Sequence, residues 1–118
     1  MRGTVLVVDD DVEIRETLAG VLIEEGYDVA KAVHGREALD QIRAGLRPDL
    51  IVLDLMMPVM DGWQFLEERA KAHLLEDVPV VVISATPETL HPPEVRAFVR
   101  KPMRLDALLD VIEREIGR

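Results

Sequence analysis

Polar side chains follow each of four short apolar runs in this sequence, and their types could together bind a cation and a phosphoryl group. Three carboxylates brought together repel one another, so at least one would be protonated unless they shared a cation. Magnesium suits such a set because it binds carboxylate and phosphate oxygens and keeps several waters. A lysine ammonium and a serine hydroxyl would supply hydrogen-bond donors to the phosphoryl oxygens. The residues are Asp9, Asp10 and Asp11 after the first run, Asp54 after the second, Ser84 after the third and Lys101 after the fourth.

The apolar runs predict β-strands that are buried on both faces, because the runs are continuous and rich in β-branched residues. Segments with the apolar spacing of amphipathic helices separate the runs, and the last of them carries an apolar stripe from Leu105 to Ile116. A third helix is predicted from near Asp61 to about His73. The predicted strands are Thr4 to Val8, Tyr27 to Ala32, Leu50 to Leu53, Val78 to Ile83 and a short one near Ala97 to Arg100.

The alternation of strands and helices predicts an α/β fold with a parallel sheet between two layers of helices. In an open sheet of this kind, ligands bind beyond the carboxyl ends of the strands, where the strand order reverses. We therefore expect Asp9, Asp10, Asp54, Ser84 and Lys101 to lie together at one edge of the sheet.

The composition excludes several classes of function. The chain has 118 residues, enough for one domain, which we expect to span residues 1–118. A formal net charge of −9 opposes direct binding to nucleic acid or to anionic membranes. With no cysteine, the chain has no disulfide, thiolate metal site or cysteine nucleophile. We see no signal peptide or membrane span and expect a cytoplasmic protein.

Some of the polar residues have a structural interpretation instead. Asp11 is expected to cap the first helix, because aspartate is a favoured N-cap and suits the helix dipole. Asp54 or Ser84 alone would be ordinary residues at a strand end, so the interpretation as a site depends on the whole set. The histidines, His34, His73 and His91, lack the spacing of metal ligands and are expected on the surface or in loops, and the methionines Met56, Met57 and Met60 are expected to pack beneath a loop.

The motifs taken in order resemble the receiver domain of bacterial two-component response regulators. The similarity covers the whole chain, and it implies a three-layer (βα)5 flavodoxin-like fold with the sheet order 2-1-3-4-5. The motifs that carry it are VLVVDDD (Val5 to Asp11), PDLIVLDLMMPVMDG (Pro48 to Gly62), VVVISAT (Val80 to Thr86) and FVRKP (Phe98 to Pro102).

The resemblance implies that Asp54 takes a phosphoryl group from a phosphohistidine and becomes an acyl phosphate. Asp10, Asp54 and the carbonyl group of Met56 would bind Mg²⁺ directly, and Asp9 would bind it mainly through a water. Such a protein is a signalling phosphoacceptor, which catalyses only its own phosphorylation and dephosphorylation. The catalytic residues would be Asp54, Ser84 and Lys101, and the magnesium ligands Asp9, Asp10, Asp54 and Met56.

The resemblance also implies a switch and two kinds of partner. The counterparts of Ser84 and Phe98 move after phosphorylation in the family, and this alters a partner-binding face. The phosphodonor would be a sensor histidine kinase or a phosphotransfer protein, and the downstream protein is not identified by the sequence. The Lys101–Pro102 bond matches a cis peptide of the family. Met56 offers no strong hydrogen bond to an attacking water, so slow dephosphorylation is expected.

One segment departs from the family pattern. The interval from Ser84 to Lys101 is short by about one helical turn, and it contains Pro87, Pro92 and Pro93. The fourth helix is therefore predicted to be short or missing. This makes the usual output face doubtful, so a monomer or a weak dimer is expected.

Two other functions remain open from the sequence. A phosphorylation-independent interaction domain, or pseudo-receiver, would fit the altered region from Ala85 to Arg96. A phosphatase of the haloacid-dehalogenase type would use Asp9 and Asp11 as nucleophile and acid. Those enzymes need a larger core and a cap, so the length of the chain argues against the phosphatase.

Overall fold

Five parallel strands form the centre of the protein, and the computed structural model describes residues 2–85 and 95–117. Strands and helices alternate along the chain as far as β4, and α4 follows β5. The elements are β1 (Thr4–Val8), α1 (Val12–Glu24), β2 (Asp28–Ala32), α2 (Gly35–Arg43), β3 (Leu50–Asp54), α3 (Gly62–Lys71), β4 (Val80–Ser84), β5 (Ala97–Arg100) and α4 (Leu105–Ile116).

The sheet has the order β2-β1-β3-β4-β5, which confirms the predicted topology. The chain leaves β1 for β2 on one side and later returns to β3 on the other side of β1. The strand order therefore reverses between β1 and β3, and this is where an open α/β sheet binds its ligand. In the register of β3 and β4, Asp54 lies beside Ile83, so Asp54 and Ser84 end neighbouring strands.

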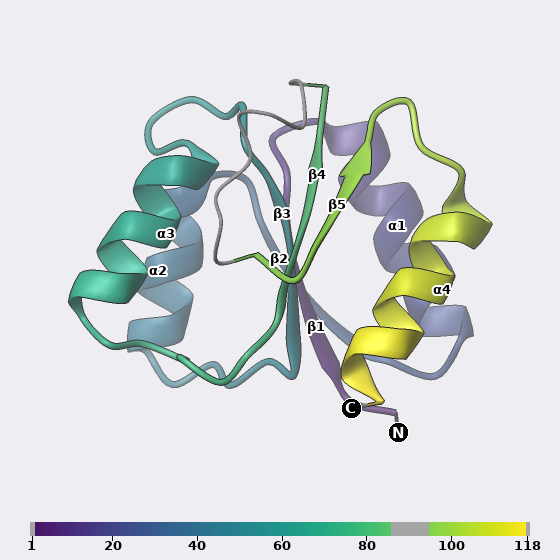
Figure 1. Ribbon diagram of the computed structural model, residues 1–118, viewed down its shortest axis with the longest axis horizontal. Coiled ribbons are helices and arrows are strands. Elements are labelled where there is room, and N and C mark those ends of the chain that lie inside the picture. The colour runs from purple at the N-terminus through teal and green to yellow at the C-terminus, as the bar shows by residue number, and fades with distance from the viewer. Residues whose placement is uncertain (1, 86–94, 118) are drawn as a thin grey trace.

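Helices cover both faces of the sheet, with α2 and α3 on one face and α1 and α4 on the other (Figure 1). Successive residues of β1 point to opposite faces, so Leu6 and Val8 pack with α2 and α3, whereas Val5 and Val7 pack with α1 and α4. Each face of β1 is buried, which explains why the strand is a continuous apolar run.

Side-chain caps fix where three of the helices begin. The carboxylate of Asp11 accepts hydrogen bonds from the backbone N–H groups of Glu13 and Ile14, which confirms the predicted N-cap of α1. Asp61 caps α3 in a capping box with Gln64. The imidazole Nδ1 of His34 caps α2, a function that the sequence analysis missed because histidine is not among the favoured N-caps.

The end of the third helix differs from the prediction, and the predicted fourth helix falls outside the described residues. Helix α3 ends at Lys71, slightly before the predicted end, because His73 adopts a left-handed φ of 53° and the Leu74 N–H returns to the Arg69 carbonyl. The predicted short or missing fourth helix falls on residues 86–94, which lie outside the described residues. Within residues 2–85 and 95–117, no helix has the length and apolar character needed to span a membrane.

Candidate functional site

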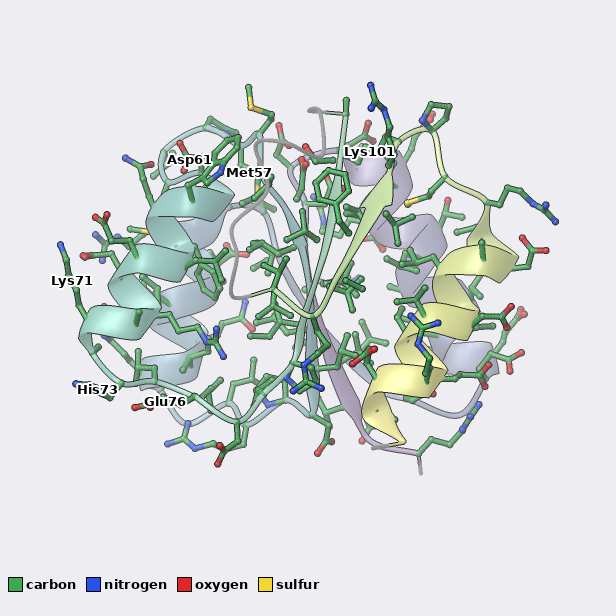
Figure 2. The ribbon with its side chains drawn as sticks, viewed as in Figure 1. Met57, Asp61, Lys71, His73, Glu76 and Lys101 are labelled. Carbon is green, nitrogen blue, oxygen red and sulfur yellow. The ribbon has the colours of Figure 1, made fainter. Side chains whose placement is uncertain are left out.

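The acidic residues and Lys101 meet at the carboxyl ends of the strands. The Lys101 ammonium lies 3.0 Å from Asp9 Oδ2 and 3.5 Å from Asp54 Oδ2. Figure 2 shows Lys101 at the same end of the sheet as Met57, and Met57 lies in the β3–α3 loop. The Lys101–Pro102 peptide bond is cis, and the Lys101 N–H donates to the Ser84 carbonyl, which joins the end of β5 to that of β4.

The three carboxylates form a cluster of a size that suits Mg²⁺. Asp9, Asp10 and Asp54 each contribute one carboxylate oxygen to a group in which all the oxygens lie within 4.8 Å of one another. Ligands on opposite sides of an octahedral Mg²⁺ are about 4 Å apart, so small side-chain adjustments would bring these oxygens onto one ion. Asp9 and Asp54 are buried, and Asp10 is exposed. The donor set is therefore all oxygen and open to solvent on one side.

Backbone contacts hold Asp9 in place. Its N–H donates to the Ala32 carbonyl, and its own carbonyl accepts a hydrogen bond from the Arg15 guanidinium at 2.9 Å. The Asp9 carboxylate accepts from the Asp11 N–H at 2.9 Å. Arg15 was not selected by the sequence analysis, because nothing in the sequence distinguishes it from other charged residues of an amphipathic helix.

The position of Asp54 depends on a close approach between β3 and the start of α3. The Gly62 N–H donates to the Leu55 carbonyl at 2.9 Å, which closes the loop after Asp54. A Cβ atom at Gly62 would lie 2.6 Å from the Asp54 carbonyl oxygen and 2.8 Å from Leu55 Cα. Only glycine fits at position 62, which explains sterically why the motif from Pro48 to Gly62 ends in glycine.

The tip of the same loop is tied to α2. The Gly35 N–H donates to the Met60 carbonyl at 2.9 Å, and a Cβ at Gly35 would lie 2.8 Å from Met60 Cγ. Between these anchors, Met60 N–H donates to the Pro58 carbonyl at 2.7 Å, and Val59 adopts a φ of 66°. A β-branched residue is strained in this region, so the loop beside Asp54 stores conformational energy.

The charges in the site shift its acid–base properties. Burial, followed by the charge of Asp9, raises the pKa of Asp54 to about 6. Burial alone would lower the pKa of Lys101, but the carboxylates of Asp54 and Asp9 outweigh it and raise this pKa. Lys101 therefore stays protonated, and Asp54, although harder to ionise than an ordinary aspartate, is mostly ionised at neutral pH.

The remaining candidate residues lie around this centre. Ser84 is fully buried at the end of β4, and Phe98 is half-buried against the core on the side of α2 and α3. Met57 and Met60 are buried as expected. The prediction that Met56 also packs beneath the loop is wrong, because 59% of this residue is exposed. Its backbone N–H lies 3.4 Å from Asp54 Oδ1.

A cavity of about 510 Å³ opens beside Lys101. Its walls are mainly apolar, and they come from the first half of α1, from the end of β4 and from the segment between β5 and the start of α4. The lining residues are Glu13, Ile14, Thr17, Ala85, Lys101, Pro102, Met103 and Leu105. Another molecule could therefore contact the protein next to the carboxylate cluster.

The family described as the response regulator receiver domain matches residues 5–113 of this chain. This match spans nearly all of the sheet and the helices described above. The chain therefore belongs to the receiver domains of two-component response regulators, in agreement with the motifs at the strand ends. Receiver domains generally bind Mg²⁺ at an acidic cluster, which corresponds here to Asp9, Asp10 and Asp54.

Individual relatives agree with this assignment. The chain is 41% identical over 90 residues to the DNA-binding response regulator MtrA of Mycolicibacterium paratuberculosis, a match that covers 76% of this chain and 38% of that protein. The chain spans little more than a third of the length of the curated relatives it matches.

Two solved structures have the same fold over almost the whole chain. A CheY-like response regulator receiver domain protein from Methanospirillum hungatei superposes with a TM-score of 0.88 at 25% identity, covering 99% of this chain and 96% of that one. The response regulator TrrA from Thermotoga maritima, solved in complex with Mg²⁺ and BeF, gives a TM-score of 0.81 at 30% identity, covering 95% and 97%.

Proposed function

We propose that this receiver domain, spanning residues 1–118, accepts a phosphoryl group on Asp54. The observation that carries the proposal is the contact of Lys101 with Asp9 and Asp54 inside a cluster of three carboxylates. A buried carboxylate whose pKa is raised to about 6 is still mostly ionised at neutral pH, so it can act as a nucleophile. The cation beside it can neutralise the charge of an incoming phosphoryl group.

The reaction that we propose transfers the phosphoryl group from a histidine side chain of a donor protein. An oxygen of the Asp54 carboxylate forms a bond to phosphorus, and the bond from phosphorus to the imidazole nitrogen breaks. The electron pair of that bond stays on the imidazole, which takes up a proton. Lys101 and the hydroxyl group of Ser84 hold the phosphoryl oxygens in line for this step. Because such a transition state is loose, positioning and charge neutralisation supply most of the catalysis.

Magnesium fits the residues present. We propose that Asp10, Asp54 and the carbonyl oxygen of Met56 are direct ligands and that Asp9 acts mainly through a water. The distances within the carboxylate cluster support this, as does the complex of TrrA with Mg²⁺ and BeF. The ion would supply positive charge to oxygens of the phosphoryl group.

We propose that the phosphodonor is a sensor histidine kinase or a phosphotransfer protein. The cavity between α1 and the chain after β5 supports this, because it places apolar walls directly beside Lys101. Phosphorylation would then move Ser84 and Phe98 and change a surface read by a downstream protein. A net charge of −9 argues against DNA binding by this domain itself, although MtrA is a DNA-binding protein as a whole. The proposed location is the cytoplasm.

The decisive experiment is phosphorylation with acetyl phosphate and Mg²⁺, followed by intact-mass spectrometry. We expect one added phosphoryl group on the wild-type protein, none on Asp54→Asn, and a normal addition on Asp110→Asn, an exposed control on α4. An equal addition on Asp54→Asn would disprove the assignment of Asp54.

The two alternatives predict different results. The carboxylate of Asp11 caps α1, so it is not placed as the general acid of a phosphatase. Steady turnover of p-nitrophenyl phosphate that is lost in Asp9→Asn would support the phosphatase. Partner binding that is unaffected by Asp54→Asn and by beryllofluoride would support the interaction domain.

The phosphoryl group on Asp54 is expected to be long-lived. The backbone of Met56 contacts Asp54, and its exposed thioether gives no strong hydrogen bond to an attacking water. Met56→Asn places an amide there, so we expect it to shorten the half-life of the phosphorylated protein at least threefold. An unchanged decay rate after removal of acetyl phosphate would contradict this explanation.

A further inference from the structure

The methionines of the β3–α3 loop differ sharply in exposure. Met57 and Met60 are 9% and 8% exposed and belong to the core on the side of α2 and α3, whereas Met56 is 59% exposed. The full sequence contains five methionines and no cysteine. Thioethers are therefore the side chains of this chain that peroxides oxidise most readily, and exposure selects among them.

The exposed methionine is also the one beside the phosphoacceptor. The backbone nitrogen of Met56 lies 3.4 Å from Asp54 Oδ1. The side chain of Met56 is therefore attached to the backbone next to the carboxylate that would carry the phosphoryl group. Met60, in contrast, packs against Gly35 on α2. Met57 lies in the same loop, at the end of the sheet where Lys101 is found (Figure 2). Oxidation of the accessible thioether would therefore change the chemistry of the site without opening the core.

We propose that Met56 is a peroxide-sensitive modification site, and that its oxidation to the sulfoxide shortens the lifetime of the phosphoryl group on Asp54. This inference rests on the proposed function of Asp54. A peroxide would thereby reduce the phosphorylated fraction of the protein at a constant supply of phosphodonor.

The modification needs only a hydroperoxide such as hydrogen peroxide. A lone pair of the Met56 sulfur attacks one peroxide oxygen, the O–O bond breaks, and an S–O bond forms. The sulfur loses two electrons, the other peroxide oxygen leaves as hydroxide, and the hydroxide takes the proton of the new S–OH group through solvent to give water. The product is methionine sulfoxide, which thiol-dependent reductases return to methionine.

Oxidation of Met56 to the sulfoxide changes the hydrogen-bond acceptor that is available to an attacking water. The thioether is a weak hydrogen-bond acceptor, whereas the sulfoxide oxygen is a polar acceptor on a side chain of the same length. An oriented water adds its oxygen to phosphorus, and the bond from phosphorus to the Asp54 oxygen breaks. The carboxylate is regenerated, and the water protons pass to the phosphate and to solvent. Orienting the nucleophile in this way accelerates the reaction.

The first test measures selectivity. The unphosphorylated protein is treated with hydrogen peroxide, and oxidation at each methionine is followed over time by tandem mass spectrometry, which assigns the added oxygen to a residue. We expect Met56 to gain one oxygen at least five times faster than Met57, Met60 and the half-buried Met103. Oxidation of Met57 or Met60 at the same rate as Met56 would overturn the proposal.

The second test measures the phosphoryl lifetime. Oxidised and untreated proteins are phosphorylated with acetyl phosphate and Mg²⁺, the donor is removed, and the decay is followed by intact mass. We expect the oxidised protein to lose the phosphoryl group at least threefold faster and a methionine sulfoxide reductase to restore the slow rate. In Met56→Leu the decay rate should be the same with and without peroxide. In Met56→Gln, which keeps a polar acceptor, it should be fast in both conditions.

Met57→Leu is the matched control from the same loop. Leucine conserves volume in the core, so the variant should fold and should still respond to peroxide. If Met56→Leu responds as the wild-type protein does, the proposal is wrong. If the untreated protein takes up no phosphoryl group, the proposed function fails and this inference fails with it. Normal uptake with an unchanged lifetime after oxidation overturns this inference alone.

Discussion

At the amino-terminal end of the sheet, Arg2 and Arg96 form ion pairs with carboxylates, whereas at the carboxyl end Lys101 lies beside a cluster of three carboxylates. At the amino-terminal end, the Arg2 guanidinium lies 2.6 Å from Glu113 and covers the ring of Tyr27, and Arg96 lies 3.3 Å from the buried Glu115. At the carboxyl end, Lys101 contacts Asp9 and Asp54 together. Arg2 and Arg96 are thus each paired with a carboxylate, whereas the cluster beside Lys101 contains three carboxylates.

This difference supports the proposal that the carboxyl end of the sheet is the end that binds a ligand. A crowded, partly buried group of like charges destabilises the folded state unless a ligand compensates it. The strained backbone of Val59 lies in the loop at the same end. Like charges are thus crowded where the family places its site, as is common at functional sites. Four changes test this comparison, and we take them in order of expected effect.

Removing Lys101 should have the largest effect. Lys101→Met leaves Asp9 and Asp54 without their cation, so we expect the free energy of unfolding to fall by about 2–4 kcal/mol without Mg²⁺. Millimolar Mg²⁺ should recover most of the loss, because the ion supplies the missing positive charge. Denaturant titrations with and without Mg²⁺ measure both quantities. The control is Lys71→Met, an exposed lysine on α3 (Figure 2). A loss as small as that of the control would contradict the comparison.

Asp54→Asn should stabilise the protein, in a way that depends on pH. The pKa of Asp54 is raised to about 6 in the folded state from an ordinary value of 3.8. Between these values the folded state binds more protons than the unfolded state, so stability due to this group falls as the pH rises from about 4 to about 6. Above pH 6 the full penalty applies. The variant should therefore be about 2–3 kcal/mol more stable than the wild type at pH 8.

The same difference should disappear at pH 4, where Asp54 is protonated in the folded protein. Thermal unfolding of the wild type and of Asp54→Asn from pH 4 to pH 8, without Mg²⁺, gives the difference in stability between them at each pH. Contributions of the other titratable groups to stability cancel in this difference. A stabilisation that is constant over this range would show that the charge of Asp54 is not its cause.

The sheet and the arrangement of the candidate site could be predicted from the sequence because both depend on strand order. Continuous apolar runs marked the strands, and parallel strands place their carboxyl ends at one edge. This brought Asp9, Asp54 and Lys101 together although they are far apart in the chain. Asp11 could be predicted as a cap because its side chain acts on the next turn of the chain.

Features that depend on the packing of one side chain could not be predicted in this way. Met56 and Met57 are adjacent and chemically identical, yet one is exposed and the other buried, because the loop turns between β3 and α3. The cap by His34 depends on the tautomer and rotamer of the imidazole. The left-handed φ of Val59 arises from the two anchors of its loop, at Gly35 and Gly62.

The strain at Val59 gives the third test. Val59→Gly removes a β-branched side chain from a φ of 66° without removing a buried contact, because Val59 is 76% exposed. We expect a gain of about 1 kcal/mol in the free energy of unfolding. The comparison variant is His73→Gly at the opposite end of the sheet, which also has a positive φ but is not β-branched. Its gain should be smaller, and a larger one would argue against special strain beside the site.

Glu113→Gln tests the amino-terminal end and should have the smallest effect of the four. The ion pair of Glu113 with Arg2 is short, but both side chains are partly exposed, so solvent screens it and the amide can still accept a hydrogen bond. We expect a slight lowering of the melting temperature that disappears at high salt and does not depend on Mg²⁺. If Mg²⁺ binds at the cluster of Asp9, Asp10 and Asp54 as proposed, a Mg²⁺-dependent loss in Glu113→Gln would mean that the two ends of the sheet are coupled rather than independent.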